Sequence, residues 1–534
     1  MPRHDSQRSQ AHRKWRQRRT TATVIAALVL TVLVSAWLAF VYYSHKSDCW
    51  QEGPEWPGGP VAFPWEDDLL PLAPLQGALH MHEGNESKRP DISFRNVVFN
   101  IAGSAQHWSK RKEYVQLWWR PDEMLGFLWL DEKIEVSKEE ATLFPQVVIS
   151  EDISRFRYTY PTSQPSGVRI ARIIQEVFKL GMPNVCWFVL GDDDTIFSPD
   201  NLMRVLKKYD HNEMYYIGNP SESHASNTHF SHGMAFGGGG IAISYPLAET
   251  LSRMLDECLE RYTFLIGSDD RLHACITELG VPLTKESGFH QFDVHGNVFG
   301  LLAAHPISPF VSMHHLEEVE PFFPKLDALA SLRHLMYSMR TEPSSFLQHC
   351  LCYDREQKLS LSVSLGYVVQ VFPYVILPRE LERPEITFKA WNSKQSRGEF
   401  DLDTRKSLKP VCHKPVSFYI EDIYVDENGA VVSTYKRDTA VDEMKKHSLC
   451  LPIVFHPKKV KKIHIFSQPM SDQWFLKVHV NATFLLSTSL HIHMHVMQEL
   501  TCAFLEDLSK GDWGTLLKLV LFADFWYTQV WEGI

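Results

Sequence analysis

The 534-residue sequence predicts an α/β fold with a mostly parallel sheet, preceded by one membrane-spanning helix and followed by a β-rich extension. Short apolar runs have the length and the β-branched and aromatic content of buried strands at 97–103, 126–130, 146–150, 185–190 and 214–217. Helical patterns separate them, as at 167–180, where Val168, Ala171, Ile174 and Phe178 share one face. Strands that alternate with helices in this way favour a parallel sheet.

The pattern changes from about residue 343. Ser360, Ser362 and Ser364 alternate with apolar neighbours, which predicts a half-buried strand at 359–365. Asn428-Gly429 lies between two apolar runs and is a strong signal for a hairpin. We therefore expect an α/β domain at 92–342 and a β-rich domain at 343–478, whereas 479–534 is a tail of uncertain structure.

The N-terminus has the features of a membrane anchor. Residues 1–19 contain seven basic side chains against one acid, a charge of +6, and residues 20–44 contain no charged side chain. The second segment is long enough to cross a bilayer, and its basic flank should stay in the cytosol. Residues 45–91 are rich in Pro, Gly and Trp and are expected to form a stem. The predicted topology is single-pass type II.

Charge and cysteine content narrow the possible functions. The chain has a formal net charge of −10, so the part after the basic tail carries about −16, which argues against a nucleic-acid-binding surface. The nine cysteines include no CxxC pair, and in a lumen some of them should form disulfides, with Cys412 and Cys450 as candidate partners.

Three adjacent acids, Asp192, Asp193 and Asp194, directly follow the strand predicted at 185–190. Because like charges repel, such a run gains little without a cation. An acid run by itself is more often a solvated loop or a calcium site. Its position at the end of a buried strand, where ligands of α/β sheets bind, favours a metal–diphosphate site.

Three further segments could contribute to such a site. Gly237 to Gly240 let the backbone approach a ligand closely, or form a flexible turn. Asp269 and Asp270 open a predicted helix, where acids serve as caps or could act as a general base. His314-His315, followed by Leu316 and Glu317, could supply an imidazole to a divalent ion or simply pack in the fold.

In this order, the four segments resemble the Fringe-like β-1,3-glycosyltransferases, especially their plant-type branch, over about residues 92–324 and more loosely to 474. The resemblance implies a GT-A-like nucleotide-sugar-binding fold in the Golgi lumen and a DxD motif that holds Mn²⁺ or another divalent cation against a UDP-sugar. By this match Asp194 is the direct metal ligand, with Asp192 and Asp193 beside the metal or the sugar-nucleotide.

The same resemblance assigns the other segments. Gly238 and Gly239 would line the donor and acceptor cleft. Asp270 would be the catalytic base, with Asp269 as the alternative. His315 would complete the metal site, with His314 as the alternative. Arg271 departs from the family, which usually has a small or apolar residue there.

The implied activity is inverting transfer of a hexose from a UDP-sugar to a hydroxyl of a glycan or glycoprotein, with a β-1,3 linkage, by a Golgi type II membrane enzyme. Two alternatives use the same residues. A metal-dependent luminal hydrolase would release sugar or phosphate without an acceptor. A non-catalytic glycan-binding or scaffold protein would keep its function when Asp194 is replaced.

Overall fold

The computed structural model describes residues 92–161, 164–354, 359–391, 400–407, 414–438, 460–467, 469–470, 500–504 and 516–523, the last two stretches as backbone only. The predicted basic tail, membrane anchor and stem, at 1–91, lie outside this part of the chain, as do Cys412 and Cys450. Within the described residues, no helix has both the length and the apolar character needed to span a bilayer.

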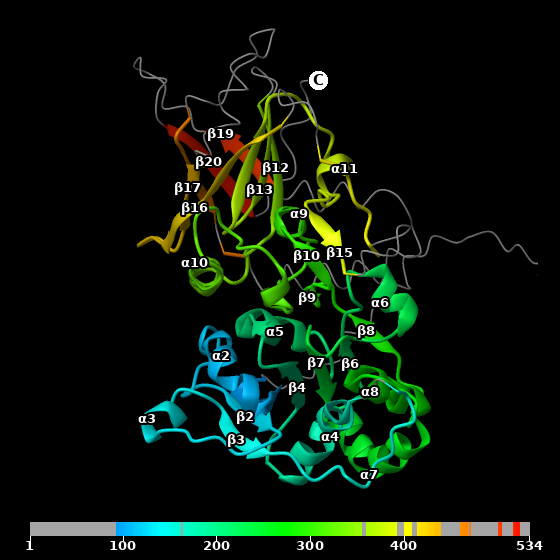
Figure 1. Ribbon diagram of the computed structural model, residues 1–534. Coiled ribbons are helices and arrows are strands. Elements are labelled where there is room, and N and C mark those ends of the chain that lie inside the picture. Colours follow the sequence, from blue (N-terminus) through cyan, green and yellow to red (C-terminus); the bar gives the residue numbers. More distant parts are fainter. Residues whose placement is uncertain are drawn as a thin grey trace, which may run out of the picture. The chain divides into compact units, whose positions relative to one another are not determined.

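The first part of the described chain is built on a seven-stranded sheet with the order β3-β2-β1-β4-β7-β6-β8 (Figure 1). Its strands are β1 (Val97–Ala102), β2 (Leu125–Leu130), β3 (Gln146–Ile149), β4 (Trp187–Asp192), β6 (Tyr216–Gly218), β7 (Ile241–Ser244) and β8 (Leu283–Lys285). The prediction of a mostly parallel sheet holds for β1 to β4 and for the β6–β8 pair, but β7 runs antiparallel to both β4 and β6. The sheet is therefore mixed.

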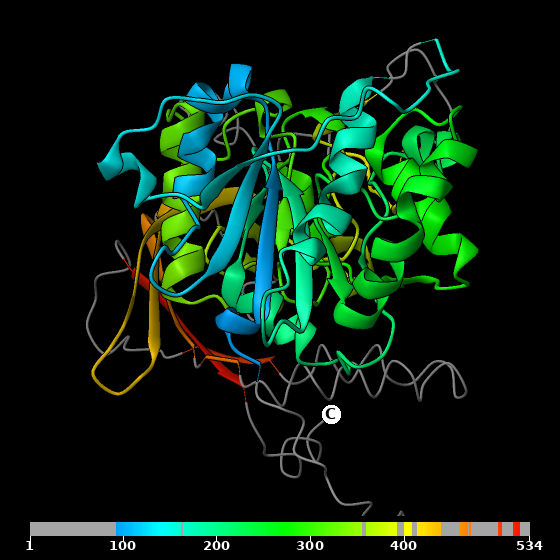
Figure 2. The same ribbon diagram turned by 90° about the horizontal axis from the view of Figure 1, so that it is seen from below.

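Helices pack on both faces of this sheet (Figure 2). One face is covered by α4 (Pro165–Lys179), α7 (Tyr245–Arg261) and α8 (Ser268–Glu278), whose apolar residues form one buried cluster with alternate side chains of β1, β4 and β7. On the other face, α2 (Ala105–Gln116) and α5 (Pro199–Leu206) pack against the remaining side chains. The helices predicted near 110–116, at 167–180 and after Ser198 correspond to α2, α4 and α5. Short helices α3 (Lys138–Ala141) and α6 (His224–His229) lie in connecting segments.

A small three-stranded sheet brings distant parts of the sequence together. It has the order β5-β11-β9, formed by β5 (Ile196–Phe197), β11 (Ser312–Met313) and β9 (Phe289–His290). Met313 pairs with Ile196 in antiparallel register. The residue after Met313 therefore comes to lie beside the residues before Ile196, which places His314 next to the acid run.

The predicted β-rich region forms an eight-stranded sheet with the order β12-β13-β14-β16-β17-β18-β20-β19. The strands are β12 (His349–Asp354), β13 (Leu359–Ser364), β14 (Val368–Phe372), β16 (Val416–Val425), β17 (Val431–Arg437), β18 (Lys462–Ser467), β19 (Leu500–Phe504) and β20 (Leu516–Ala523). The hairpin predicted around Asn428-Gly429 is β16–β17. The tail of uncertain structure contributes β19 and β20, and β20 pairs in parallel with β18.

The prediction that 359–365 is half-buried is wrong, because β13 is buried along its whole length. Its serines are accommodated by hydrogen bonds. Ser360 Oγ donates to Tyr374 O at 3.0 Å, and Ser364 Oγ donates to Leu302 O at 2.8 Å. The serines of β13 therefore lie on a buried face where they form hydrogen bonds, and their alternation with apolar residues does not indicate an exposed face.

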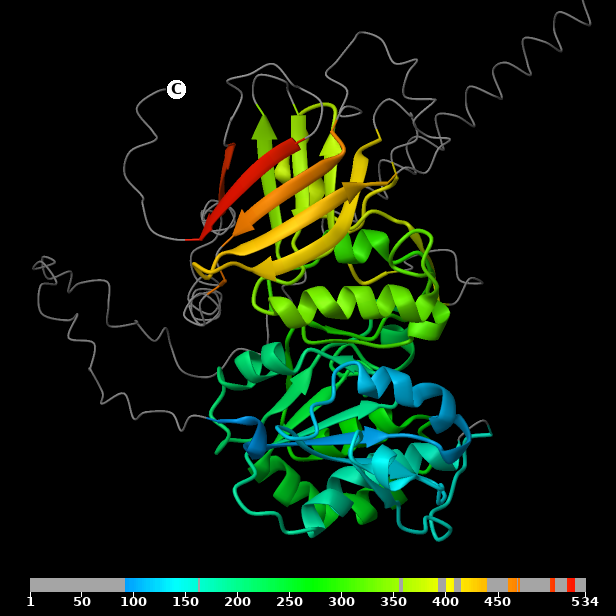
Figure 3. The same cartoon turned by 90° about the vertical axis from the view of Figure 1, so that its left-hand side faces the viewer.

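Connecting elements complete this part of the chain. These are β10 (Val294–Gly296), paired with β15 (Phe388–Ala390), and the helices α9 (Phe299–Ala303), α10 (Ala328–Thr341) and α11 (Pro378–Leu381). The long helix α10 lies between the two large sheets (Figure 3). Its Arg333 pairs with Glu113 of α2 at 3.0 Å, and its His334 Nε2 lies 2.9 Å from Ile420 O of β16.

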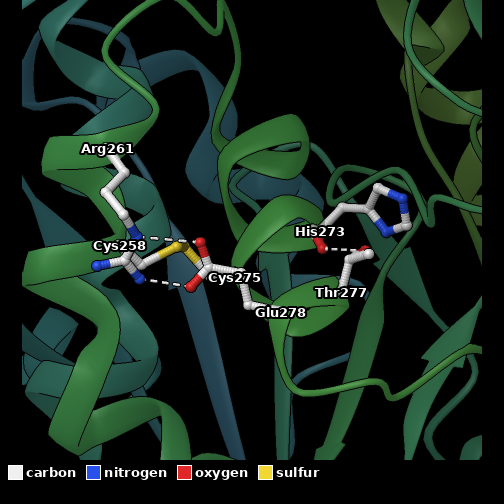
Figure 4. Close-up of a disulfide and its surroundings, with 6 residues drawn as sticks. All are labelled: Cys258, Arg261, His273, Cys275, Thr277 and Glu278. Atoms are coloured by element: carbon white, nitrogen blue, oxygen red, sulfur yellow. Dashed lines mark hydrogen bonds and ion pairs between the residues drawn. A yellow bond between two sulfur atoms is a disulfide. The ribbon is translucent and has the colours of Figure 1, made fainter.

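A disulfide joins α7 to α8 (Figure 4). Cys258 and Cys275 are both fully buried, and their Cα atoms are 5.9 Å apart. Beside them, Arg261 Nε donates to Glu278 Oε1 at 3.1 Å. Because α8 begins with Asp269 and Asp270 in its first turn, this bond fixes the helix that presents the acidic pair.

Candidate functional site

The acid run forms a tight turn at the end of β4. Thr195 N donates to Asp192 O at 3.0 Å, and the Thr195 hydroxyl accepts from Asp192 N at 2.8 Å. The same hydroxyl donates to Gly238 O at 2.7 Å, which joins the turn to the glycine run. Asp193 and Asp194 are each about 2% exposed, so the acids do not form a solvated loop.

Asp192, Asp194 and His314 come together in a triangle that could hold a cation. One ligand atom from each lies within 4.8 Å of the others. His314 Nε2 is 3.1 Å from Asp194 Oδ1 and 3.6 Å from Asp192 Oδ2. His314 and Asp194 are buried, whereas the Asp192 side chain is one-third exposed. Two carboxylates and one imidazole are ligands that suit Mn²⁺ or another borderline divalent ion, so the residues present fit a metal.

The histidine in this triangle is His314 and not His315, contrary to the assignment by resemblance. His315 is not one of its three ligands: its Nδ1 lies 2.9 Å from Asp293 Oδ1, and its ring packs against that of His314 at a centroid distance of 4.0 Å. Its ring stacks on Trp391 at a centroid distance of 4.6 Å, and its backbone is left-handed with φ of 54°. The β5–β11 pairing places His314 beside the acid run.

Arg111 of α2 is a site residue that the sequence did not reveal. Its guanidinium lies 2.9 Å from Asp193 Oδ1, 3.1 Å from Asp194 Oδ2 and 3.4 Å from Glu317 Oε2. One arginine thereby neutralises part of the acid run before any cation binds. No spacing or motif distinguishes Arg111 from the neighbouring basic residues of its helix.

These contacts shift the pKa values of Asp194 and Asp192 in opposite directions. Burial alone would raise the pKa of Asp194, but His314 and Arg111 lower it to about 2. Shielding from water raises the pKa of Asp192 well above its usual value, and the charges of Asp194 and Asp269 raise it further. Asp194 is therefore an ionised ligand, and a cation bound beside Asp192 would favour its ionised form against the effect of burial.

The glycine run allows the backbone to touch the site residues. A Cβ on Gly238 would lie 2.2 Å from His314 Cε1, and a Cβ on Gly237 would lie 2.5 Å from Asp269 Oδ1. Gly240 has φ of 99°, a conformation that favours glycine. We predicted that the run approaches a ligand closely or forms a turn. In the structure it approaches the side chains that would bind the ligand.

Asp269, the first residue of the acidic pair, lies against this run at Gly237. Asp269 accepts hydrogen bonds from the Gly237 backbone and from Ser268 Oγ, the latter at 3.0 Å. It lines a narrow pocket together with Asp192 and Gly237. Asp270 follows it in the helix and is partly exposed. Burial raises the pKa of both carboxyl groups, and the charge of Asp269 adds to the shift of Asp270.

Arg271, which departs from the resembled family, does not face this cleft. The residue is fully buried, and Nη1 donates to Ile266 O at 2.7 Å and to Gly267 O at 2.9 Å. Gly167 of α4 leaves room for it, since a Cβ there would lie 2.9 Å from Arg271 Nη1. Arg271 supports the loop before α8, and its charge opposes the rise in the pKa of Asp270 that burial causes.

The arrangement combines a cation site with carboxylates that have raised pKa values. A divalent ion can neutralise charge on a leaving group, and a carboxylate beside it can accept a proton. These are the components of a metal-dependent transfer or hydrolysis reaction.

Comparisons with known proteins bear on this choice. Residues 226–481, just under half of the chain, match a family described as "Protein of unknown function, DUF604". This range includes the glycine run, the acidic pair and His314 but begins after the acid run. Two β-1,3-glucosyltransferases, from Mus musculus and Homo sapiens, are each 29% identical over 119 residues, which is 22% of this chain. The chain covers 23% of the length of each relative.

Solved structures of glycosyltransferases are similar only weakly. The galactosyltransferase LgtC with donor and acceptor sugar analogues is 11% identical, with 44% of this chain and 93% of that chain covered and a TM-score of 0.28. Mouse xyloside xylosyltransferase 1 is 10% identical, with 36% and 84% covered and a TM-score of 0.23. The sequence similarity to glycosyltransferases is that to the two β-1,3-glucosyltransferases, over 119 residues.

Proposed function

We propose that the protein is a metal-dependent glycosyltransferase that transfers a sugar from a UDP-sugar to a hydroxyl of a glycan or glycoprotein. The observation that carries this proposal is the triangle of Asp192, Asp194 and His314, with Asp269 against Gly237 of the adjoining glycine run. The similarity to β-1,3-glucosyltransferases supports it and makes UDP-glucose the first donor to test. The GT-A-like fold, the Fringe-like relationship and the β-1,3 linkage are parts of the same proposal.

In this proposal, Asp192, Asp194 and His314 hold a divalent cation such as Mn²⁺. When bound, the cation supplies Lewis-acid neutralisation of the charge that develops on the departing UDP. Asp193 and Arg111 stay paired beside it and orient the acid run. Gly238 packs directly against the His314 ring, where a Cβ would clash, and in this proposal Gly238 and Gly239 line the donor and acceptor cleft.

Asp270 is the proposed general base that accepts the proton of the acceptor hydroxyl. A raised pKa suits this role, because a general base works best when its pKa is near the operating pH. Asp269 is the alternative, but its carboxylate already accepts from Gly237 and Ser268. Attack by a hydroxyl on the face opposite UDP inverts the anomeric centre, and one base is sufficient for this.

We also propose that the enzyme is a single-pass type II protein of the Golgi membrane. This rests on the basic residues 1–19 followed by the uncharged segment 20–44. The domain limits at 92–342 and 343–478 belong to the same proposal. Localisation of a tagged full-length chain, with protease protection of the C-terminal tag in intact vesicles, tests it. Digestion of that tag without detergent would contradict the topology.

The activity is tested by UDP release from a panel of UDP-sugars by the full-length chain with Mn²⁺, with and without glycan acceptors. Asp194→Asn is the variant, and His107→Ala, an exposed residue of α2, is the matched control. We expect acceptor-dependent release that Asp194→Asn abolishes and His107→Ala preserves. Release that does not require an acceptor would favour the hydrolase. No release with any donor would favour the glycan-binding or scaffold protein.

A further inference from the structure

A second group of metal-ligating side chains lies outside the candidate active site. His224 of α6, His232 in the loop after α6, and Asp401 place one possible ligand atom each within 4.8 Å of one another. His232 Nε2 is 3.0 Å from Asp401 Oδ2, and His224 Nδ1 contacts Asp401 Oδ1. All three side chains are accessible to solvent, so an ion could reach them.

The spacing of these atoms suits a small divalent ion. Zinc binds imidazole nitrogen and carboxylate oxygen at about 2.0–2.1 Å, which places the ligand atoms of a tetrahedral site about 3.3 Å apart. The 3.0 Å between His232 Nε2 and Asp401 Oδ2 is close to that value. Two imidazoles and one carboxylate select a borderline transition ion over calcium or magnesium, and water would take the fourth position.

Hydrogen bonds behind the three ligands hold them in place. The Thr228 hydroxyl lies 3.3 Å from His224 Nε2, the ring nitrogen that does not face Asp401. Asn227 Nδ2 donates to Asp401 Oδ2 at 2.7 Å. Asn227 is itself buried and fixed by Ser221, whose backbone N–H donates to Asn227 Oδ1 at 3.0 Å. Such partners of ligating residues orient them and strengthen metal binding.

The group also joins two distant segments of the chain. Phe400 forms a bridge with Ser223, and Asp401 N donates to Glu222 O at 3.1 Å. The loop that contains His232 leads directly into Gly237, which contacts Asp269. A cation bound here would therefore fix residues 400–401 to α6 and to the loop that enters the candidate active site.

We propose that His224, His232 and Asp401 form a second divalent-metal site, which joins residues 400–401 to α6 and is selective for zinc-like ions. The site is separate from the Asp192–Asp194–His314 triangle, and the proposal does not depend on the proposed transferase activity. Ser221 connects the two regions, because its hydroxyl donates to Asp293 Oδ2 at 2.7 Å and Asp293 faces His315. Loss of the bound metal should loosen α6 and the loop after α6 that contains His232.

The test measures zinc bound to the purified, detergent-solubilised full-length chain after removal of metals and dialysis against Zn²⁺. Asp194→Asn is present throughout to disable the first site. His232→Ala and Asp401→Asn each remove one ligand, and His211→Ala, in the loop after α5, is the control for loss of a histidine. We expect one zinc fewer per chain in both ligand variants than in the control.

A milder variant guards against misfolding. Thr228→Val keeps all three ligands and removes the hydrogen bond to His224 Nε2, so zinc affinity should fall by about 10–100-fold while the fold is retained. Zinc should also raise the melting temperature of the control but not of His232→Ala. Equal zinc content in His232→Ala, Asp401→Asn and His211→Ala would overturn the proposal, because the three residues would then be a hydrogen-bonded group without a metal.

Discussion

Replacing Gly238 with alanine should damage the candidate metal site without removing any of its ligands. The new Cβ would lie 2.2 Å from Cε1, 2.4 Å from Nδ1 and 2.6 Å from Nε2 of His314. An ordinary contact begins at 3.4 Å, so ring and backbone must separate by about 1.2 Å. The His314 side chain is 5% exposed and has little free space into which to move.

The displacement has two calculable consequences. Misplacement of a site residue by about 1 Å can cost about 10²-fold in rate, and we expect a loss of that size in metal-dependent UDP release. Overpacking of a buried contact costs about 1–3 kcal/mol in the free energy of unfolding. The alternative, movement of the glycine run, would break the Thr195–Gly238 hydrogen bond of 2.7 Å and loosen the acid run.

The assay compares Gly238→Ala with Gly233→Ala, both in the wild-type chain and in His314→Ala. A Cβ on Gly233 meets nothing closer than 3.5 Å, so this control should be neutral. Denaturant unfolding should show a coupling energy of about 1–3 kcal/mol between Gly238→Ala and His314→Ala, since removal of the ring relieves the clash. The reasoning is refuted if Gly238→Ala is as stable and active as Gly233→Ala.

Three other predictions concern single groups. Asp270→Asn should lower transfer by about 10²–10⁴-fold without loss of fold, and full activity in Asp270→Asn with loss in Asp269→Asn would move the base to Asp269. Burial, and then Arg405, lower the pKa of His349 to about 4, so between pH 6.5 and 4 the unfolded chain binds a proton that the folded chain does not. The free energy of unfolding should therefore fall by up to about 3 kcal/mol as pH falls through this range, and His349→Gln should flatten the urea-unfolding profile; identical profiles would contradict it. Cys258→Ala/Cys275→Ala opens a loop of 17 residues and should cost about 3 kcal/mol of stability, and equal denaturation midpoints in the variant and wild type would contradict this.

Local pattern accounts for what the sequence could predict. Strand and helix positions in the α/β part follow from runs of apolar residues, and the acid run follows directly from the end of one such strand. The glycine run itself is visible in the sequence, but its residues are equally typical of a flexible turn, so the sequence leaves close approach as one of two alternatives. These features depend only on residues that are close together in the sequence, so the sequence alone is sufficient to predict them.

Pairings between distant segments account for what could not be predicted. Which of His314 and His315 joins the candidate metal site depends on the pairing of Met313 with Ile196, and this pairing cannot be predicted from the sequence. The direction of β7 depends on the path of the chain between β6 and the glycine run. Arg111 joins the acid run only because α2 packs on the sheet so that its guanidinium reaches Asp193 and Asp194. The full burial of β13 requires covering elements from other parts of the chain.

The central claim is that Asp194 helps to hold a cation that binds UDP, and calorimetric titration of UDP into the full-length chain tests it most directly. The titration is made in Mn²⁺ and in EDTA, with wild type and Asp194→Asn, and circular dichroism checks that both are folded. We predict that UDP affinity falls by at least about tenfold, or 1.4 kcal/mol, on removal of either Mn²⁺ or the Asp194 carboxylate. Equal UDP affinity in Mn²⁺, in EDTA and in the variant would contradict the claim.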